Sequence, residues 1–327
     1  MNARPLSILF TSAGRRVELI ECFARAGRQL GRGMTTHACD LYPDLSAACH
    51  YADHSARVPR CDAPEYVDIL LDYCTQYDID LLIPTIDPEL YPLAFAKERF
   101  AAAGTKVHVS EPETIEIVRD KARTIEVLQR GGVPVPRTGK VREVKRTPHD
   151  WEWPAFIKPS GGSASRGIAV LEDANAIAEH YDEPMIVQQL LDGDEYTVNI
   201  FVDEQGKLRT AIPHKRLSVR AGEVEKGITV RRADIQEIAE KLVDALPGGE
   251  GAMCFQLIDD KRHGPRVFEI NARFGGGYPL ADKAGGRFAE RLLVGIDQPG
   301  LAEPPSWQES DWKEGVTMLR YDAAVFL

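Results

Sequence analysis

The residues best suited to chemistry in this chain lie in one predicted β-hairpin near its end. Glu269 and Asn271 are two positions apart, so on a strand both side chains point to one face, while Phe268 and Ile270 point to the other. A hairpin centred at 262/263 pairs Gln256 with Glu269 and adds a second amide to that face. These oxygen ligands suit a hard cation such as Mg²⁺. A solvated polar sheet face would show the same alternation.

The hairpin is followed directly by an arginine and a glycine run. Arg273 is two positions beyond Asn271, and three glycines occupy positions 275–277. Backbone N–H groups exposed by glycine and a nearby guanidinium can stabilise the charge of a reacting anion. This arrangement favours catalysis over a purely solvated surface.

An earlier segment joins a lysine to a loop of glycine and serine. Lys158 ends a predicted strand, and the next strand begins at 168. Glycine allows backbone N–H groups to approach an anion, and lysine adds a positive charge. The order of glycine, lysine and serine residues is not that of a Walker A loop. A flexible β-hairpin turn is the alternative interpretation of this segment. We predict a phosphate-binding loop containing Lys158, Gly161, Gly162, Ser163, Ser165 and Gly167.

Between these segments, an apolar strand at 185–187 runs into Gln188 and Gln189, a turn and Glu195. Such a strand end could hold a purine by its edge, with Glu195 accepting hydrogen bonds from ribose hydroxyls. Taken alone, this pattern more often indicates a core strand followed by an exposed turn.

The elements that must position these residues begin with alternating strands and helices. The pattern predicts strands at 6–10, 36–40, 80–85 and 106–109, and helices at 17–26, 66–77 and 90–103. This alternation indicates a doubly wound parallel-sheet α/β domain over residues 1–112. A single helix at 113–130 then opens a second part, which from residue 156 onward is rich in strands.

Composition excludes several classes of protein. The 327 residues are 43% hydrophobic and 28% charged, which excludes a disordered chain. A net charge of −10 argues against nucleic-acid binding, and no apolar run is long enough to span a membrane. The six cysteines lack metal-ligand spacing, so we expect reduced thiols and a cytoplasmic location.

Other polar clusters have more than one interpretation. The turn at 12–16 contains one glycine where a dinucleotide fingerprint needs three, which disfavours NAD binding, although Arg15 and Arg16 could hold an acidic co-substrate. Asp87 and Glu89 are interpreted as the start of a helix rather than a catalytic pair. The basic residues at 214–216 fit a phosphate contact or a solvated strand end equally well.

In their order along the chain, these segments resemble the ATP-grasp superfamily, particularly the synthetase modules of the carbamoyl-phosphate synthase large subunit and related carboxylate–amine ligases. The resemblance implies an ATP-grasp α+β domain pair over residues 113–327, with a lid at about 113–187 and a metal and substrate subdomain at about 188–327. Gln189 stands where many members carry glutamate, and the glycine loop is shorter than in carbamoyl-phosphate synthase. With one synthetase module, the chain is not expected to make carbamoyl phosphate.

The same resemblance assigns roles to single residues. It implies ATP and Mg²⁺, or Mn²⁺ in its place, with phosphates on Lys121 and Lys158 and the transferred group stabilised by Arg273. The metal ligands are Gln256, Glu269 and Asn271, and the adenine and ribose contacts are Gln188, Gln189, Leu190, Leu191 and Glu195.

We therefore expect a ligase that uses ATP to activate a small-molecule carboxylate as an acyl phosphate. An amine would then capture this intermediate and release ADP and phosphate. A homodimer is expected from the family alone. The alternatives are a nucleotide-binding sensor without ligase activity and, less favoured, an NAD-binding oxidoreductase.

Overall fold

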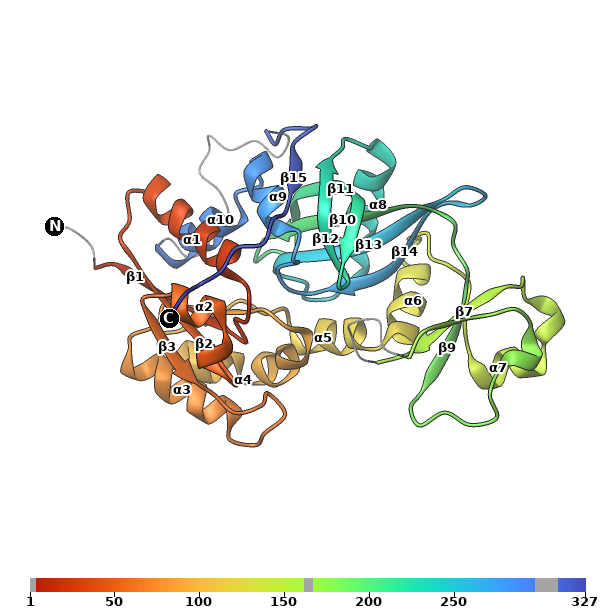
Figure 1. Ribbon diagram of the computed structural model, residues 1–327, viewed down its shortest axis with the longest axis horizontal. Coiled ribbons are helices and arrows are strands. Elements are labelled where there is room, and N and C mark those ends of the chain that lie inside the picture. The colour runs from red at the N-terminus through yellow and green to blue at the C-terminus, as the bar shows by residue number, and fades with distance from the viewer. Residues whose placement is uncertain (1–3, 162–166, 298–310) are drawn as a thin grey trace.

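A five-stranded parallel sheet organises the N-terminal part of the chain (Figure 1). The computed structural model describes residues 4–161, 167–297 and 311–327. The strand order is β3-β2-β1-β4-β5, so the order reverses direction between β1 and β4. The strands are β1 Leu6–Thr11, β2 Met34–Asp40, β3 His54–Arg57, β4 Leu81–Pro84 and β5 Lys106–Val107, and the helices between them are α1 Val17–Gln29, α2 Ala47–Tyr51, α3 Tyr66–Gln76 and α4 Leu90–Ala102.

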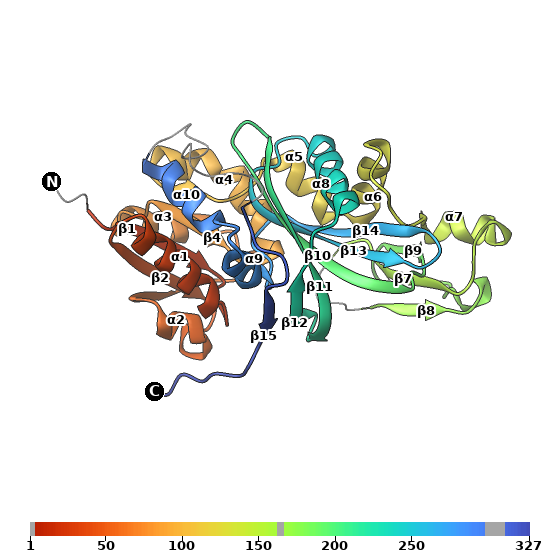
Figure 2. The same ribbon diagram turned by 90° about the horizontal axis from the view of Figure 1, so that it is seen from above.

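Alternate residues of these strands bury opposite faces of the sheet. Ile8 and Phe10 belong to one apolar core with α1, whereas Leu9 belongs to another with α3 and α4. Two helices from the far end of the chain, α9 Tyr278–Ala284 and α10 Phe288–Asp297, pack against α1 (Figure 2). Helices therefore cover both faces, which confirms the doubly wound sheet.

In the described residues, two antiparallel sheets follow the parallel sheet along the chain. The larger has the order β14-β13-β10-β11-β12-β15 and the smaller β6-β9-β7-β8. The smaller sheet lies away from the parallel sheet, at the far side of the molecule (Figure 1). The larger sheet comprises β10 Gly193–Val202, β11 Leu208–Arg220, β12 Glu223–Thr229, β13 Gly251–Asp260, β14 Gly264–Asn271 and β15 Thr317–Leu319, and α8 Ala233–Ala245 lies between β12 and β13 in the chain. The smaller sheet comprises β6 Thr138–Lys140, β7 Ala155–Pro159, β8 Ala169–Leu171 and β9 Met185–Gln189, and α7 Val141–Arg146 lies between β6 and β7 in the chain. One-turn 3₁₀ helices occur at Pro43–Leu45, Asp87–Glu89, Pro148–Asp150 and Ala174–Ala176.

The prediction of one helix at 113–130 is wrong. The structure has two helices, α5 Pro112–Arg119 and α6 Lys121–Arg130, separated at Asp120. Asp120 has extended backbone angles, and its carboxylate accepts hydrogen bonds from the N–H groups of Ala122 and Arg123. Aspartate is a strong N-cap, so it starts a new helix where apolar spacing alone predicts continuity.

The β13–β14 hairpin has the predicted pairing of Gln256 with Glu269, but for a different reason. The turn pairs Asp260 with Gly264, and a bulge at Phe268 then shifts the register by one residue. The bulge turns Phe268 to the same side as Glu269, which corrects the prediction that the two side chains point to opposite faces of the strand. Val267 and Ile270 are buried, whereas Phe268 is only partly buried.

One smaller boundary also differs from the prediction, since β5 ends at Val107 rather than at residue 109. None of the helices within the described ranges has the length and apolar character that a bilayer crossing requires.

Candidate active site

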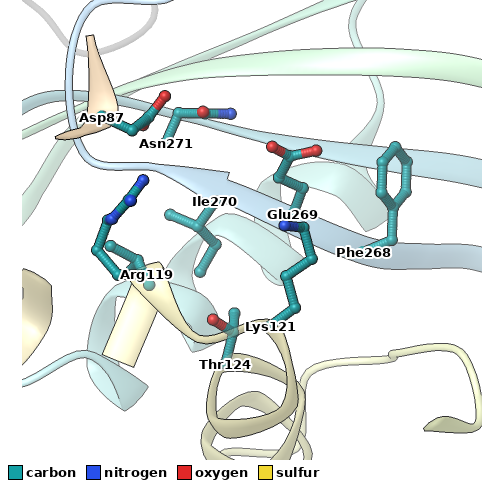
Figure 3. A pocket seen from close by; sticks show the side chains of 9 residues that line it. Asp87, Arg119, Lys121, Thr124, Phe268, Glu269, Ile270 and Asn271 are labelled. Atoms are coloured by element: carbon teal, nitrogen blue, oxygen red, sulfur yellow. The ribbon is translucent and has the colours of Figure 1, made fainter. Parts of the chain in front are cut away.

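A polar pocket forms where three parts of the chain meet (Figure 3). One wall comes from β14, one from the junction of α5 and α6, and one from the 3₁₀ turn after β4. The pocket is lined by Asp87, Val118, Arg119, Lys121, Thr124, Phe268, Glu269, Ile270 and Asn271. Three of the predicted site residues, Lys121, Glu269 and Asn271, therefore lie in one pocket.

The break between α5 and α6 positions Lys121. The backbone N–H of Lys121 donates to the Ser160 carbonyl oxygen at 2.8 Å, and Ser160 Oγ donates to Asp120 Oδ1 at 2.6 Å. From the first position of α6 the side chain extends toward Glu269 (Figure 3), and its Nζ donates to the Gly161 carbonyl at 3.3 Å. The helix start is thereby tied to the beginning of the predicted phosphate loop.

Lys158 is a buried cation on β7. The residue is only 6% exposed, and its Nζ lies 5.4 Å from the centre of the Phe268 ring. Burial lowers the Lys158 pKa to about 8; the charge of Glu269 opposes this shift and that of Lys121 adds to it. Burial also lowers the pKa of Lys121, again against the charge of Glu269. Two ammonium groups held in such surroundings favour a bound anion.

Arg273 completes the site beyond the end of β14. Its Nη2 donates to Asp87 Oδ2 at 2.6 Å and to Asn271 Oδ1 at 3.0 Å. Burial acts to lower the Arg273 pKa, but the surrounding groups, Asp87 foremost among them, together outweigh burial and the pKa is raised. Arg273 therefore stays a guanidinium, and its Nε is buried without a hydrogen-bond partner among the described residues.

The proposed metal ligands share one face of the larger sheet. Gln256 on β13 lies directly across from Glu269 on β14, and Cys254 lies across from Asn271. The Glu269 carboxylate and the amides of Gln256 and Asn271 therefore occupy neighbouring positions on the two strands. Within the described residues, no three His, Cys, Asp or Glu side chains converge on a point. The donors present are hard oxygen atoms, which fit Mg²⁺ provided that substrate phosphates and water complete its coordination.

The predicted adenine and ribose residues are already engaged with other parts of the protein. Gln188 Nε2 donates to Thr138 Oγ1 at 2.8 Å, and Gln189 Nε2 lies 3.0 Å from His263 Nδ1. Leu190 is exposed and Leu191 half-buried in the link to β10. Glu195 accepts from Arg216, and burial raises its pKa against the charge of Arg216. The structure brings Glu195 near Glu269, but neither glutamine side chain points freely into the pocket.

The glycine loop is described only at its two ends. Gly161 contacts Lys121 as given above, and Gly167 has a φ of +66° in the left-handed region that favours glycine. Gly162, Ser163 and Ser165 lie outside the described residues.

Several residues that sequence analysis assigned elsewhere belong to this region. Asp87 does begin a 3₁₀ turn, but it also forms an ion pair with Arg273, and no local pattern signals a contact between residues 186 positions apart. Phe268 was missed because the bulge is not visible in the alternation of residues. His214 is fully buried beside Asn199, and burial lowers its pKa to about 3, so it is not part of a solvated strand end.

The turn after β1 is occupied by protein contacts. The Gly14 N–H donates to Asp40 Oδ2 at 2.8 Å, and Ser12 Oγ donates to the buried Glu89 at 2.9 Å. Arg15 and Arg16, which were predicted to be able to hold an acidic co-substrate, both form ion pairs with Glu223 of the larger sheet.

Comparison with known proteins agrees with this architecture. A family model described as a PylC-like N-terminal domain matches residues 8–108, and one described as an ATP-grasp domain matches residues 118–277. The phosphoribosylamine–glycine ligase of Escherichia coli K12 is 25% identical over 242 residues, which cover 64% of this chain and 56% of that protein. The carbamoyl phosphate synthase large chain of Corynebacterium glutamicum is 26% identical over 257 residues, covering 71% of this chain and 22% of that protein.

A solved structure extends the likeness to almost the whole chain. The biotin carboxylase of Campylobacter jejuni superposes with a TM-score of 0.74 at 18% identity, covering 95% of this chain and 74% of that one. At this identity the likeness concerns the fold. The chain spans about half the length of the E. coli ligase and about a fifth of the synthase. Together, the two domain matches show that the chain joins a PylC-like N-terminal domain to an ATP-grasp domain and belongs to the ATP-grasp superfamily.

Proposed function

We propose that this protein is an ATP-dependent ligase that joins a small-molecule carboxylic acid to an amine, with release of ADP and phosphate. A carboxylate is a poor electrophile, because its negative charge repels a nucleophile and its oxygen is a poor leaving group. Transfer of the γ-phosphoryl group to a carboxylate oxygen gives an acyl phosphate. The amine then attacks the carbonyl carbon, and inorganic phosphate leaves with the former carboxylate oxygen.

The side chains of the pocket have distinct roles in this proposal. Lys121 and Lys158 hold the ATP phosphates, and Arg273 stabilises the charge that develops on the transferred group. Glu269, Asn271 and Gln256 would hold Mg²⁺, which supplies charge neutralisation for the β- and γ-phosphates. Glu195 accepts hydrogen bonds from the ribose. The glycine loop excludes water that would hydrolyse the intermediate.

One observation carries the proposal: the Glu269 carboxylate interacts electrostatically with Lys121, Lys158 and Arg273 alike. Arg273 is paired with Asp87, so Lys121 and Lys158 share the Glu269 carboxylate, and two lysines around one carboxylate suit a polyphosphate together with its divalent cation. The relatives support this chemistry in general terms. The E. coli relative is named for joining phosphoribosylamine to glycine, and the C. jejuni carboxylase was solved as a complex with β,γ-ATP.

A phosphate-release screen tests the proposal. The protein is incubated with ATP and Mg²⁺ and a matrix of carboxylic acids and amines, and each reaction is repeated without the acid or without the amine. A ligase releases ADP and phosphate in equal amounts only when both partners are present, and mass spectrometry finds the amide.

Two outcomes would contradict the proposal. Tight ATP binding with no turnover across the matrix would favour the nucleotide sensor. A change in NAD(H) fluorescence on mixing with the protein, without ATP consumption, would favour the oxidoreductase.

A further inference from the structure

Three arginines from distant parts of the chain surround a single carboxylate, that of Glu223. Arg16 Nη2 lies 2.9 Å from Glu223 Oε1, while Arg320 Nη1 and Arg15 Nη2 lie 3.0 Å and 3.4 Å from Glu223 Oε2. Arg15 and Arg16 precede α1, Glu223 begins β12, and Arg320 follows β15. We call Arg15, Arg16 and Arg320 the arginine cluster.

The arginine cluster has more positive charge than its protein partner neutralises. Three guanidiniums and one carboxylate leave a net charge of about +2. Burial lowers the Arg16 pKa; Glu223 opposes this shift, while Arg273, Arg320 and Arg15 add to it. Arg16 is thus a mostly buried cation near three others, an arrangement that a bound anion would relieve.

The cluster lies directly beside the proposed catalytic arginine. The loop 275–277 follows Arg273, and Arg320 Nη2 donates to the Gly276 carbonyl. A Cβ atom at Gly276 would lie 2.7 Å from Glu223 Cδ and 2.9 Å from Arg16 Nη1, so a larger residue there would displace these side-chain ends. One glycine loop is therefore all that separates Arg273 from the arginine cluster.

The topology of the parallel sheet independently places a ligand here. Ligands of open α/β sheets bind beyond the carboxyl ends of the strands, at the point where the strand order reverses. That point is between β1 and β4 in this protein. Arg15 and Arg16 follow β1, and Asp87, the partner of Arg273, follows β4.

From these observations we propose that the arginine cluster binds a second anionic group of a substrate, a carboxylate or phosphate remote from the reacting centre. This inference rests on the proposed ligase function, because it identifies the class of substrate that the same site would accept. One acid group reacts beside Arg273, and the other anion is held by Arg15, Arg16 and Arg320. When the substrate is absent, ion pairs with Glu223 hold the three guanidinium groups in place.

Matched substrates test the inference in the phosphate-release assay. Each acid is compared as a monocarboxylate, a dicarboxylate of the same chain length and a phosphorylated analogue, and the amines are compared with and without a phosphate. The inference predicts that kcat/KM for a substrate with a second anion exceeds that of its monoanionic counterpart at least tenfold. Dicarboxylates and phosphorylated compounds distinguish the two sources of the anion. Equal turnover of the mono- and dianionic forms would overturn the inference.

Variants of the cluster provide a second test. Arg16→Gln and Arg320→Gln each leave two arginines on Glu223, so we expect a Tm within about 2 °C of the wild type. KM for the anionic substrate should rise at least tenfold, with KM for ATP changed less than twofold. The matched control is Arg220→Gln, whose exposed side chain pairs with Glu225 of β12 and with Asp322 beyond β15, and which should change neither KM. A purely structural cluster would lower Tm without changing the KM ratio.

Failure of the ligase proposal can be distinguished from failure of the anion site. If no acid and amine pair is turned over, binding of succinate and of glycerol phosphate is measured by calorimetry in the presence of ADP and Mg²⁺. Binding that is lost in R16Q and R320Q but kept in R220Q would retain the anion site and reject only the ligase. Turnover of substrates with unchanged KM in R16Q and R320Q would retain the ligase and reject the anion site.

Discussion

Arg273 of the ATP-grasp domain and Asp87 of the N-terminal domain form an ion pair of 2.6 Å across 186 positions of sequence. Both side chains are nearly buried, at 13% and 12% exposure. Asp87 therefore sets where the Arg273 guanidinium lies. In the proposed mechanism, the N-terminal domain positions a catalytic group of its neighbour.

Replacing Asp87 tests this coupling. Asp87→Asn leaves Arg273 without its negative partner, so we expect the free energy of unfolding to fall by about 2 kcal/mol. We expect kcat to fall by about 10- to 100-fold with little change in the KM for ATP, because Arg273 acts on the transferred group. Urea unfolding and steady-state kinetics measure the two effects.

The matched control for Asp87→Asn is Asp62→Asn. Asp62 forms an exposed pair with Arg60, and its loss should leave both stability and kcat nearly unchanged. An unchanged kcat in D87N would show that Arg273 does not depend on Asp87.

Glu269→Gln should separate nucleotide binding from turnover. The substitution keeps the shape of the side chain but removes the carboxylate that we assign to Mg²⁺, so turnover should fall by about 100-fold or more. Nucleotide affinity, measured by calorimetry, should change much less, and half-maximal residual activity should need more Mg²⁺. Glu126→Gln, which loses only a surface pair with Arg130, is the control. Comparable turnover in E269Q and wild type would remove Glu269 from the metal site.

Lys158 gives a prediction with a defined pH range. Its pKa of about 8 in the folded protein lies below the ordinary value of 10.5, so its charged form opposes folding at neutral pH. Stability should therefore rise as the pH increases from about 8 toward 10.5. In Lys158→Met this rise should be absent, and the ligand-free protein should be about 2 kcal/mol more stable at pH 7.

The same lysine should couple ATP binding to protons. Phosphates favour the ammonium form, so wild-type protein at pH 8 to 9 should take up a fraction of a proton when ATP binds, whereas K158M should not. Calorimetry in two buffers of different ionisation enthalpy measures this uptake. K158M should also bind ATP at least tenfold more weakly; wild-type affinity in this variant would show that Lys158 does not hold the phosphates.

Asp120 links helix capping to the phosphate site. Asp120→Ala removes the N-cap of α6 and the acceptor for Ser160, which should cost about 1–2 kcal/mol of stability. Because Lys121 is the next residue, the KM for ATP should rise several-fold. Asp173→Ala removes a similar cap in the smaller-sheet region and should lower stability without changing the KM for ATP. Equal effects of the two variants on KM would contradict a specific role of Asp120.

Local sequence patterns were enough to predict most of the secondary-structure elements and the spacing of their functional groups. Short β-rich runs predicted the strand that ends at Lys158 and the strand that begins at residue 168, because such runs depend on neighbouring residues alone. The i and i+2 positions of Glu269 and Asn271 likewise predicted a shared face. The parallel N-terminal sheet followed from its alternating strands and helices, which short-range patterns report well.

Contacts between distant residues could be identified only from the folded chain. The contact between Asp87 and Arg273, and the gathering of Arg15, Arg16 and Arg320 around Glu223, join elements with no common local pattern. The Phe268 bulge and the break at Asp120 were also missed, since a bulge leaves the residue alternation nearly unchanged and a cap competes with helical periodicity. Long-range charge pairing depends on how the sheets pack, and packing is a property of the whole chain rather than of any segment.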